Sequence, residues 1–110
     1  MVKNDPPLNE NWADLAALDK IIHEPARLAA MAILDAVESA DFLYLQRATK
    51  LTKGNLSIHL QKLEEAGLID IEKTFQGKYP RTLCKLTMQG KEEFTKYKEQ
   101  IKNVFGGSAA

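Results

Sequence analysis

The chain has 110 residues, of which 45% are hydrophobic, and this is enough for one small globular domain. It contains no apolar run of about 18 residues, which excludes a membrane-spanning helix. The first residues, MVKNDPPLNENW, are polar and lack the apolar centre of a secretory signal. A single cysteine, Cys84, excludes an internal disulfide framework. Together these features predict a cytoplasmic protein.

The formal net charge is zero, but the charges are segregated along the chain. Residues 1–46 carry 3 Lys/Arg and 8 Asp/Glu, a net charge of −5, and residues 63–72 carry −4. Residues 47–62 carry +4 and residues 73–91 carry +5, and neither segment contains an acid. Such segregation is typical of a folded domain with one basic face, although chance clustering of solvated charges is the alternative.

The N-terminal half predicts helices after a flexible lead-in at residues 1–11. Residues 12–22 place apolar side chains three and four apart, which predicts a helix with a narrow apolar stripe. Pro25 should end that helix and open the next, because proline is tolerated in a first helical turn. The second helix, residues 26–37, is apolar almost all round and should be the buried spine of the domain.

Two more helices follow, each with a capping residue. Ser39 or Asp41 should cap a short third helix, FLYLQRAT, at residues 42–49. Thr52 should cap a fourth helix that runs to about residue 66, where Gly67 ends it.

The last third of the chain predicts a hairpin and a final helix. LIDIEKTFQ, residues 68–76, alternates apolar and polar residues as a half-buried strand does. Its buried face should carry Ile69, Ile71 and Phe75. GKYP should form the turn, RTLCKLT the second strand, and Thr87 the cap of a helix that reaches residue 105. Residues 106–110 should be a flexible tail. The predicted fold is therefore mainly α with a small β-hairpin, a winged helix-turn-helix over residues 12–105 with extra N- and C-terminal helices.

The fourth helix has an unusual open face. At about 100° per residue, Leu56, Leu60 and Leu63 fall on one side. The other side is small, polar or singly basic and holds no acid in its first two turns. This pattern suits a helix that enters the major groove of DNA, whereas a solubilising surface would show Glu and Lys pairs.

The side chains of this face receive separate roles. Gly54 permits close approach of the backbone, and Asn55, Ser57 and Gln61 can hydrogen-bond to base edges or phosphates. Ile58 can contact a thymine methyl group. Phosphate contacts are expected from the N-terminal turn with Thr52, and from Lys53 and Lys62. His59 lies at the border of the core, where packing is favoured over a base contact.

The hairpin tip should carry Lys78, Tyr79 and Arg81. The two cations can reach a phosphate or the minor groove, and Tyr79 can stack on a sugar.

At these residues the chain resembles a known family. PARLAAMAIL (25–34), DFLYLQRATKLTKGNLSIHLQKLEEAGLI (41–69) and LTMQG (86–90) are similar to small archaeal and bacterial winged-helix DNA-binding regulators. These regulators are related to the arsenical-resistance and multiple-antibiotic-resistance repressors. The resemblance covers about residues 23–100 and implies a homodimer that binds double-stranded DNA. It assigns base reading to the second helix of the motif and backbone contact to the wing.

The chain departs from the metal-sensing members of these families. They use clusters of Cys, His and acidic ligands, whereas this chain has one Cys and only His23 and His59. We therefore expect no metal and no cofactor. Cys84 lies inside a predicted strand, where a small core residue is favoured over a redox switch.

The terminal helices predict a dimer. Their apolar stripes exceed what a small core can cover, and packing on a symmetry mate would bury them. The expected interface residues are Leu15, Leu18, Ile22, Phe94, Tyr97, Ile101 and Phe105. The alternative is that these helices pack on their own subunit.

Function follows from these features. No nucleophile with a base, phosphate-binding loop or buried carboxylate pair is present, so an enzyme is not expected. The favoured function is a sequence-specific transcriptional regulator that represses by obstruction, and the rival is a winged helix that binds proteins. A small-molecule effector, if one exists, would bind near Trp12, the last helix or the spine.

Overall fold

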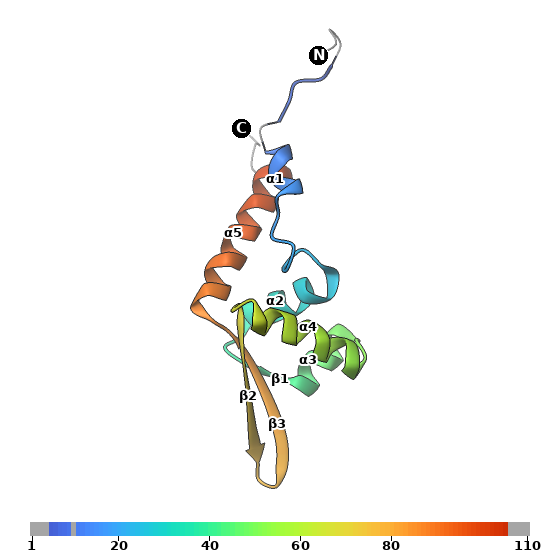
Figure 1. Ribbon diagram of the computed structural model, residues 1–110, viewed down its shortest axis with the longest axis vertical. Coiled ribbons are helices and arrows are strands. Elements are labelled where there is room, and N and C mark those ends of the chain that lie inside the picture. Colours follow the sequence, from blue (N-terminus) through green and yellow to red (C-terminus); the bar gives the residue numbers. More distant parts are fainter. Residues whose placement is uncertain (1–4, 10, 106–110) are drawn as a thin grey trace.

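The computed structural model describes residues 5–9 and 11–105. These residues form five helices and three strands in the order α1 (Trp12–Ala16), α2 (Pro25–Ala36), β1 (Ala40–Asp41), α3 (Phe42–Thr49), α4 (Lys53–Glu65), β2 (Ile69–Gln76), β3 (Tyr79–Leu86) and α5 (Met88–Phe105). The mainly α, winged-helix architecture is confirmed, with one strand more than expected (Figure 1). Part of the expected lead-in, residues 1–4 and 10, and all of the expected tail, residues 106–110, lie outside the described residues.

The first helix is shorter than expected, because α1 ends at Ala16 and not at residue 22. The Asp19 carboxylate accepts hydrogen bonds from the backbone N–H groups of Ile21 (2.8 Å) and Ile22 (3.2 Å). A short polar side chain that binds nearby backbone groups competes with the helix. The chain therefore turns here, before α2 begins at Pro25 as expected.

Helix α2 is buried on one face only. Its N-cap is Glu24, whose carboxylate accepts from the backbone N–H of Arg27 at 2.8 Å. The face toward the core carries Arg27, Ala30, Met31 and Leu34. Ala32 within the helix and Val37 just after it are exposed, so the prediction of burial all round is wrong. In a domain this small, only one side of α2 can face α3, α4 and β3.

The hairpin of β2 and β3 is the wing, and it projects from the helical body (Figure 1). Gln76 pairs with Tyr79, so Gly77 and Lys78 alone form the turn, and Gly77 adopts a φ of +63°. Glycine suits this left-handed position. The added strand β1 pairs with β3, giving the order β1-β3-β2. Its two residues are too few to produce a periodic sequence signal.

A compact junction joins the end of α4 to the start of α5. Gly67 follows α4 with a φ of +80°, as its expected role requires. Thr87 donates its hydroxyl to the carbonyl of Gly67 at 2.6 Å and accepts from the backbone N–H of Gly90 at 2.9 Å. Thr87 therefore caps α5, as predicted, and ties it to the turn before β2. Beyond this junction α5 runs alongside α1, away from the wing (Figure 1).

Candidate nucleic-acid interface

Helices α3 and α4 form a helix-turn-helix whose turn is three residues long, Lys50 to Thr52. Asp41 caps α3 by accepting from the backbone N–H of Tyr44 at 2.7 Å. Lys50 ends α3 in the left-handed region with a φ of +59°. The Thr52 hydroxyl then accepts from the backbone N–H of Asn55 at 3.2 Å and so caps α4. The left-handed Lys50 therefore ends α3, and the Thr52 cap starts α4 two residues later.

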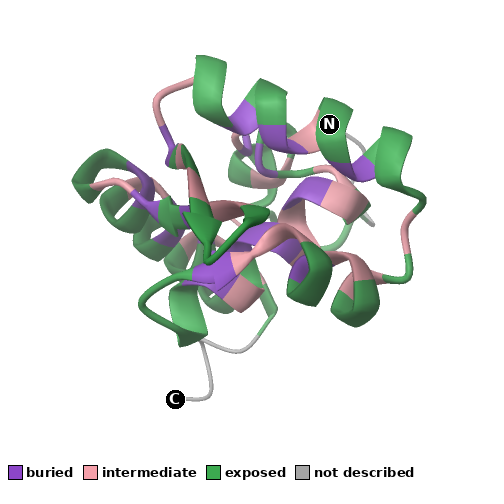
Figure 2. Cartoon of the chain, turned by 90° about the horizontal axis from the view of Figure 1, so that it is seen from below, coloured by how far each residue is buried: buried purple, intermediate pink, exposed green. Residues whose placement is uncertain are grey.

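Helix α4 divides into the two faces that its spacing predicted. Leu56, Leu60 and Leu63 are buried in the core. The opposite face is open and holds Lys53, Gly54, Asn55, Ser57, Ile58, Gln61 and Lys62, all of them exposed. Figure 2, seen from the wing end, shows such exposed turns on the outer sides of the helices. Ile58 lies in the middle of this polar and basic face with 53% of its surface exposed.

His59 lies at the edge of this face and contacts α2. Its Nδ1 lies 3.1 Å from Nη1 of Arg27 and 3.4 Å from Oε2 of Glu24. Because a guanidinium can only donate, His59 Nδ1 accepts in the contact with Arg27. Arg27 is only 8% exposed, and its remaining N–H groups donate to backbone carbonyls of the turn before α2, at Lys20 and Ile21. These contacts support the packing interpretation of His59.

Glu24 completes this cluster, which we call the α2–α4 clamp (Glu24, Arg27 and His59). Burial raises the pKa of Glu24, but hydrogen bonds from the backbone N–H groups of Arg27 and Ala26, with the nearby positive charge of Arg27, bring the pKa below its ordinary value. Glu24 therefore remains ionised, and its negative charge balances the positive charge of Arg27 where α2 contacts α4.

The wing places its expected residues in different environments. Lys78 lies in the turn, and Tyr79 beside it is 78% exposed. Arg81 does not reach the tip, because the turn has only two residues and Arg81 pairs with Thr74 inside the ladder. Its Nε lies 3.5 Å from Oδ2 of Asp41. Arg81 is therefore positioned to hold the wing against the start of α3, and its expected place at the tip is corrected.

The residues expected at a dimer interface separate into two groups. Leu18, Ile22, Phe94 and Tyr97 are buried in the core of their own subunit. They have almost no surface left to bury on a partner, which corrects their assignment. Leu15 and Ile101 are half-buried, and Phe105 is 74% exposed. This second group lies on α1 and α5, which are joined by a hydrogen bond from Asn11 Nδ2 to the carbonyl of Asn103 (3.3 Å).

Comparison with known proteins agrees with this geometry. Residues 26–105 match the family model described as a winged helix DNA-binding domain. The chain belongs to this family. A relative in Methanocaldococcus jannaschii, an uncharacterized protein, is 35% identical to this winged-helix protein over 82 residues, which are 74% of this chain and 89% of the relative.

Solved structures give the same result. A transcriptional regulator homologue from Pyrococcus horikoshii is 30% identical with a TM-score of 0.82, covering 93% of this chain and all of that one (100%). A regulator of the MarR family from Enterococcus faecalis is 22% identical with a TM-score of 0.68 over 89% of this chain and 87% of that one. The transcriptional repressor CouR, bound to a DNA duplex, is 18% identical with a TM-score of 0.61 over 86% of this chain and 76% of that one. The last two show the shared fold. The winged-helix protein therefore resembles transcriptional regulators, and its family and neighbours are not enzymes.

One residue of the winged-helix protein lies on the surface although its sequence pattern predicted burial. Phe75 was expected to be buried, but it is 70% exposed. Its alternation with Ile69 and Ile71 is correct, because all three point to the same face of β2. The hairpin simply extends beyond the body that covers this face. The length of the strand, eight residues, was the available signal.

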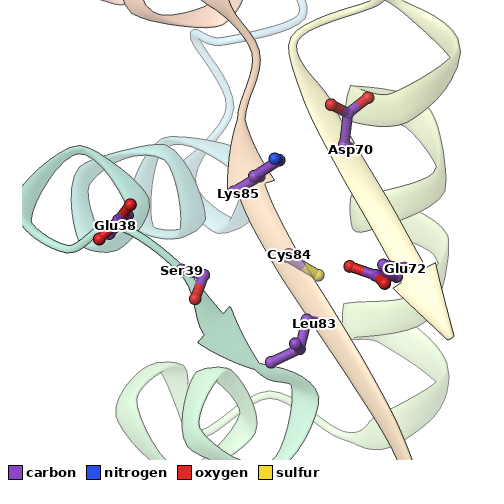
Figure 3. Close-up of a pocket in the computed structure, with 7 residues that line it drawn as sticks. All are labelled: Glu38, Ser39, Asp70, Glu72, Leu83, Cys84 and Lys85. Atoms are coloured by element: carbon purple, nitrogen blue, oxygen red, sulfur yellow. The ribbon is translucent and has the colours of Figure 1, made fainter. Parts of the chain in front are cut away.

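A hollow of about 220 Å³ lies on another side of the winged-helix protein, between the end of α2 and the sheet (Figure 3). Glu38, Asp70 and Glu72 line it with a single cation, Lys85. Three carboxylates disfavour phosphate, so DNA is not expected to bind on this side. Cys84 is also among the lining residues, but its side chain is buried in the core, and burial with the charges of Glu64 and Asp41 raises the pKa of Cys84 to about 11. Such a thiol is a poor nucleophile, which supports a packing role.

Within residues 5–9 and 11–105, no group of three or more His, Cys, Asp or Glu side chains could hold a metal ion. In the same part of the chain, none of the helices has the length and apolar character needed to span a membrane.

Proposed function

We propose that this protein is a sequence-specific transcriptional repressor that binds double-stranded DNA as a homodimer. The observation that carries the proposal is the open face of α4. It is exposed along its length, has no acid in its first two turns, and is continuous with a helix N-terminus that favours phosphate. In winged-helix proteins this helix enters the major groove.

The division of roles on α4 and the wing follows from the side chains. Asn55, Ser57 and Gln61 offer hydrogen bonds that distinguish bases, with Ile58 between them for a thymine methyl group. The ammonium groups of Lys53, Lys62 and Lys78 can bind phosphates of the DNA backbone. His59 is engaged by the α2–α4 clamp and serves to orient the helix.

The first experiment is site selection from a random duplex library, followed by fluorescence anisotropy titration of the selected duplex at several salt concentrations. We expect tight binding to the selected site and weaker binding to a scrambled duplex, with both falling steeply as salt increases. Absence of binding even at low salt would contradict the proposal and favour a winged helix that binds proteins.

Variants of α4 and the wing should separate reading from positioning. Asn55→Ala should lower the discrimination between selected and scrambled duplexes by about 1–3 kcal/mol, because a base contact is lost. Lys78→Ala should weaken binding to both duplexes equally and lower the slope of log K against log salt by about one, because one phosphate contact is lost. Anisotropy measures both quantities. Arg81→Ala is the informative control, since its pairing with Asp41 predicts a smaller change of slope than that of Lys78→Ala.

The dimer is proposed from the projecting α1–α5 pair. Trp12 is 48% exposed and Phe105 is 74% exposed, and half-buried Leu15 and Ile101 lie on the same two helices. Single exposed apolar residues are common, but two exposed and two half-buried ones on one helix pair indicate a surface that a second copy can cover. A two-fold dimer would place two α4 helices about 34–36 Å apart, so the selected site should be a pseudo-palindrome.

Phe105→Glu should convert the dimer to a monomer. A symmetric interface buries Phe105 twice, and each burial contributes about 1.5–3 kcal/mol. Sedimentation velocity over a concentration series should show a dimer dissociation constant at least a hundredfold higher than that of the wild type. Urea denaturation should show that the midpoint of the monomer is unchanged. Phe75→Ala, which changes an exposed aromatic on β2 of the wing, is the matched control and should remain dimeric. If Phe105→Glu also remains dimeric, the interface lies elsewhere.

Repression by obstruction is proposed because the fold of a DNA-bound repressor is shared. Transcription in vitro from a promoter that overlaps the selected site should fall on adding the protein. A promoter with the site moved upstream should be unaffected, and stimulation there would instead indicate an activator.

A further inference from the structure

Strand β2 has one edge without a strand partner. In the part of the chain that the structure describes, the sheet order is β1-β3-β2, and β2 pairs only with β3. Alternate backbone N–H and C=O groups along residues 69–76 therefore point away from the sheet. An extended segment of another protein can pair with such an edge and add a strand to the sheet. The proposed contacts of α4 and of the dimer do not use this edge.

Acidic side chains lie on both faces of the sheet beside this edge. Asp70 and Glu72 are exposed and two residues apart, so they project from the same face of β2. Glu38 joins them around the hollow of about 220 Å³ (Figure 3). On the face toward α4, Glu64 and Ile71 line a second hollow of about 820 Å³. The edge therefore runs between carboxylates on either side.

DNA binding does not account for these acids. Residues 63–72 carry a net charge of −4 and contain no base, although the segments before and after them carry +4 and +5. Carboxylates repel the phosphates of a duplex. A second copy of β2 is also disfavoured, because pairing that aligns the two acidic segments places Asp70 opposite Glu72, and like charges opposite each other destabilise a strand pair. Charge complementarity therefore favours a basic protein partner.

We propose that the free edge of β2 binds an extended, basic segment of another protein, which becomes a fourth strand of the sheet. Alternate side chains of the added strand project to opposite faces. Lysine or arginine at every second position then lies beside Asp70 and Glu72, and the residues between them lie beside Ile71 at the other hollow. Main-chain hydrogen bonds provide affinity in this mode of binding, and the alternating side chains provide specificity.

The test titrates a synthetic peptide of alternating Lys and Val into the full-length, ¹⁵N-labelled protein. The peptide has eight residues, the length of β2. We expect saturable binding, with the largest changes of amide chemical shift in residues 69–74. A peptide of alternating Lys and Pro has the same charge, but proline lacks an N–H donor and holds φ near −65°, which does not fit an antiparallel strand. This control should bind at least about tenfold more weakly.

Two charge reversals locate the site. Glu72→Lys should raise the Kd of the Lys–Val peptide by about tenfold, because an attractive pair across the new strands becomes repulsive. Glu92→Lys makes the same change of charge on the exposed surface of α5 and should leave Kd within about twofold of the wild type. Urea denaturation should give unchanged midpoints for both variants, since both side chains are exposed.

Three results overturn the proposal. If the Lys–Val peptide does not bind saturably, the acids only protect the edge from aggregation. If the Lys–Pro peptide binds equally well, or if Glu92→Lys weakens binding as much as Glu72→Lys, the attraction is one of net charge without an added strand. The proposed function is tested by binding of a DNA duplex, in which this peptide takes no part, so failure of either proposal leaves the other intact.

Discussion

Gly90→Ala is expected to destabilise the protein by at least about 3 kcal/mol. Gly90 is buried in the first turn of α5, and a Cβ built there would lie 1.9 Å from the carbonyl oxygen of Leu68. That oxygen is backbone and already accepts from the backbone N–H of Thr87 at 3.0 Å, so it cannot move without breaking the junction between α4 and α5. The loss is a large share of the roughly 5–15 kcal/mol that stabilises a domain.

Urea denaturation measures this effect as a fall in the midpoint at constant m-value. Gly54→Ala is the matched control, because a Cβ at Gly54 meets no atom within 4 Å. In a helix it should raise the free energy of unfolding by up to about 1 kcal/mol. Gly54→Ala should nevertheless weaken DNA binding, since it adds a methyl group to the open face of α4. Equal stability of the two variants would contradict the assigned close contact of Gly90.

Arg27→Ala is expected to cost about 3 kcal/mol of stability and to lower the discrimination of DNA sites. Arg27 is almost fully buried and donates to His59 and to two backbone carbonyls, while it balances the carboxylate of Glu24. Its removal leaves an unbalanced carboxylate and unsatisfied acceptors. It also removes the contact of His59 with α2, so we expect the orientation of the open face of α4 to become less defined. Urea denaturation and anisotropy on selected and scrambled duplexes measure the two effects.

Substitutions of His59 decide between orienting the helix and reading a base. His59→Ala should cost about 1.5 kcal/mol of stability, because Arg27 loses one acceptor. His59→Asn places an amide oxygen close to the position of Nδ1 and should restore most of that loss, together with the discrimination between duplexes. If His59→Asn recovers stability but not discrimination, His59 contacts a base and the α2–α4 clamp is not its main role.

Three helix caps and the buried face of α4 were predictable from short stretches of sequence. Thr52, Asp41 and Thr87 each cap a helix through a hydrogen bond to a backbone N–H three residues away. The spacing of Leu56, Leu60 and Leu63 likewise lies within about two helical turns. Such signals depend on neighbouring residues alone, and this is why the helix-turn-helix and the open face of α4 could be recognised.

Helix length in α1 was not predictable from periodicity. Leu15, Leu18 and Ile22 have helical spacing, but the Asp19 side chain provides an alternative set of hydrogen bonds to the backbone. Both conformations fit the same apolar pattern, since each lets Leu18 and Ile22 reach the core.

By itself, the sequence determined the order of the five helices and the two long strands, the open face of α4 and the absence of acids in residues 73–91, because these follow from local hydrogen bonding, periodicity and charge. Only the tertiary structure decided how distant segments meet. It showed that Arg81 lies against Asp41, that Arg27 engages His59, and that Phe75 extends beyond the body that covers the rest of its face. It also placed Phe94 and Tyr97 in their own subunit and left Phe105 exposed. The physical reason is that burial and pairing between residues tens of positions apart depend on how the elements pack, which an apolar stripe does not specify.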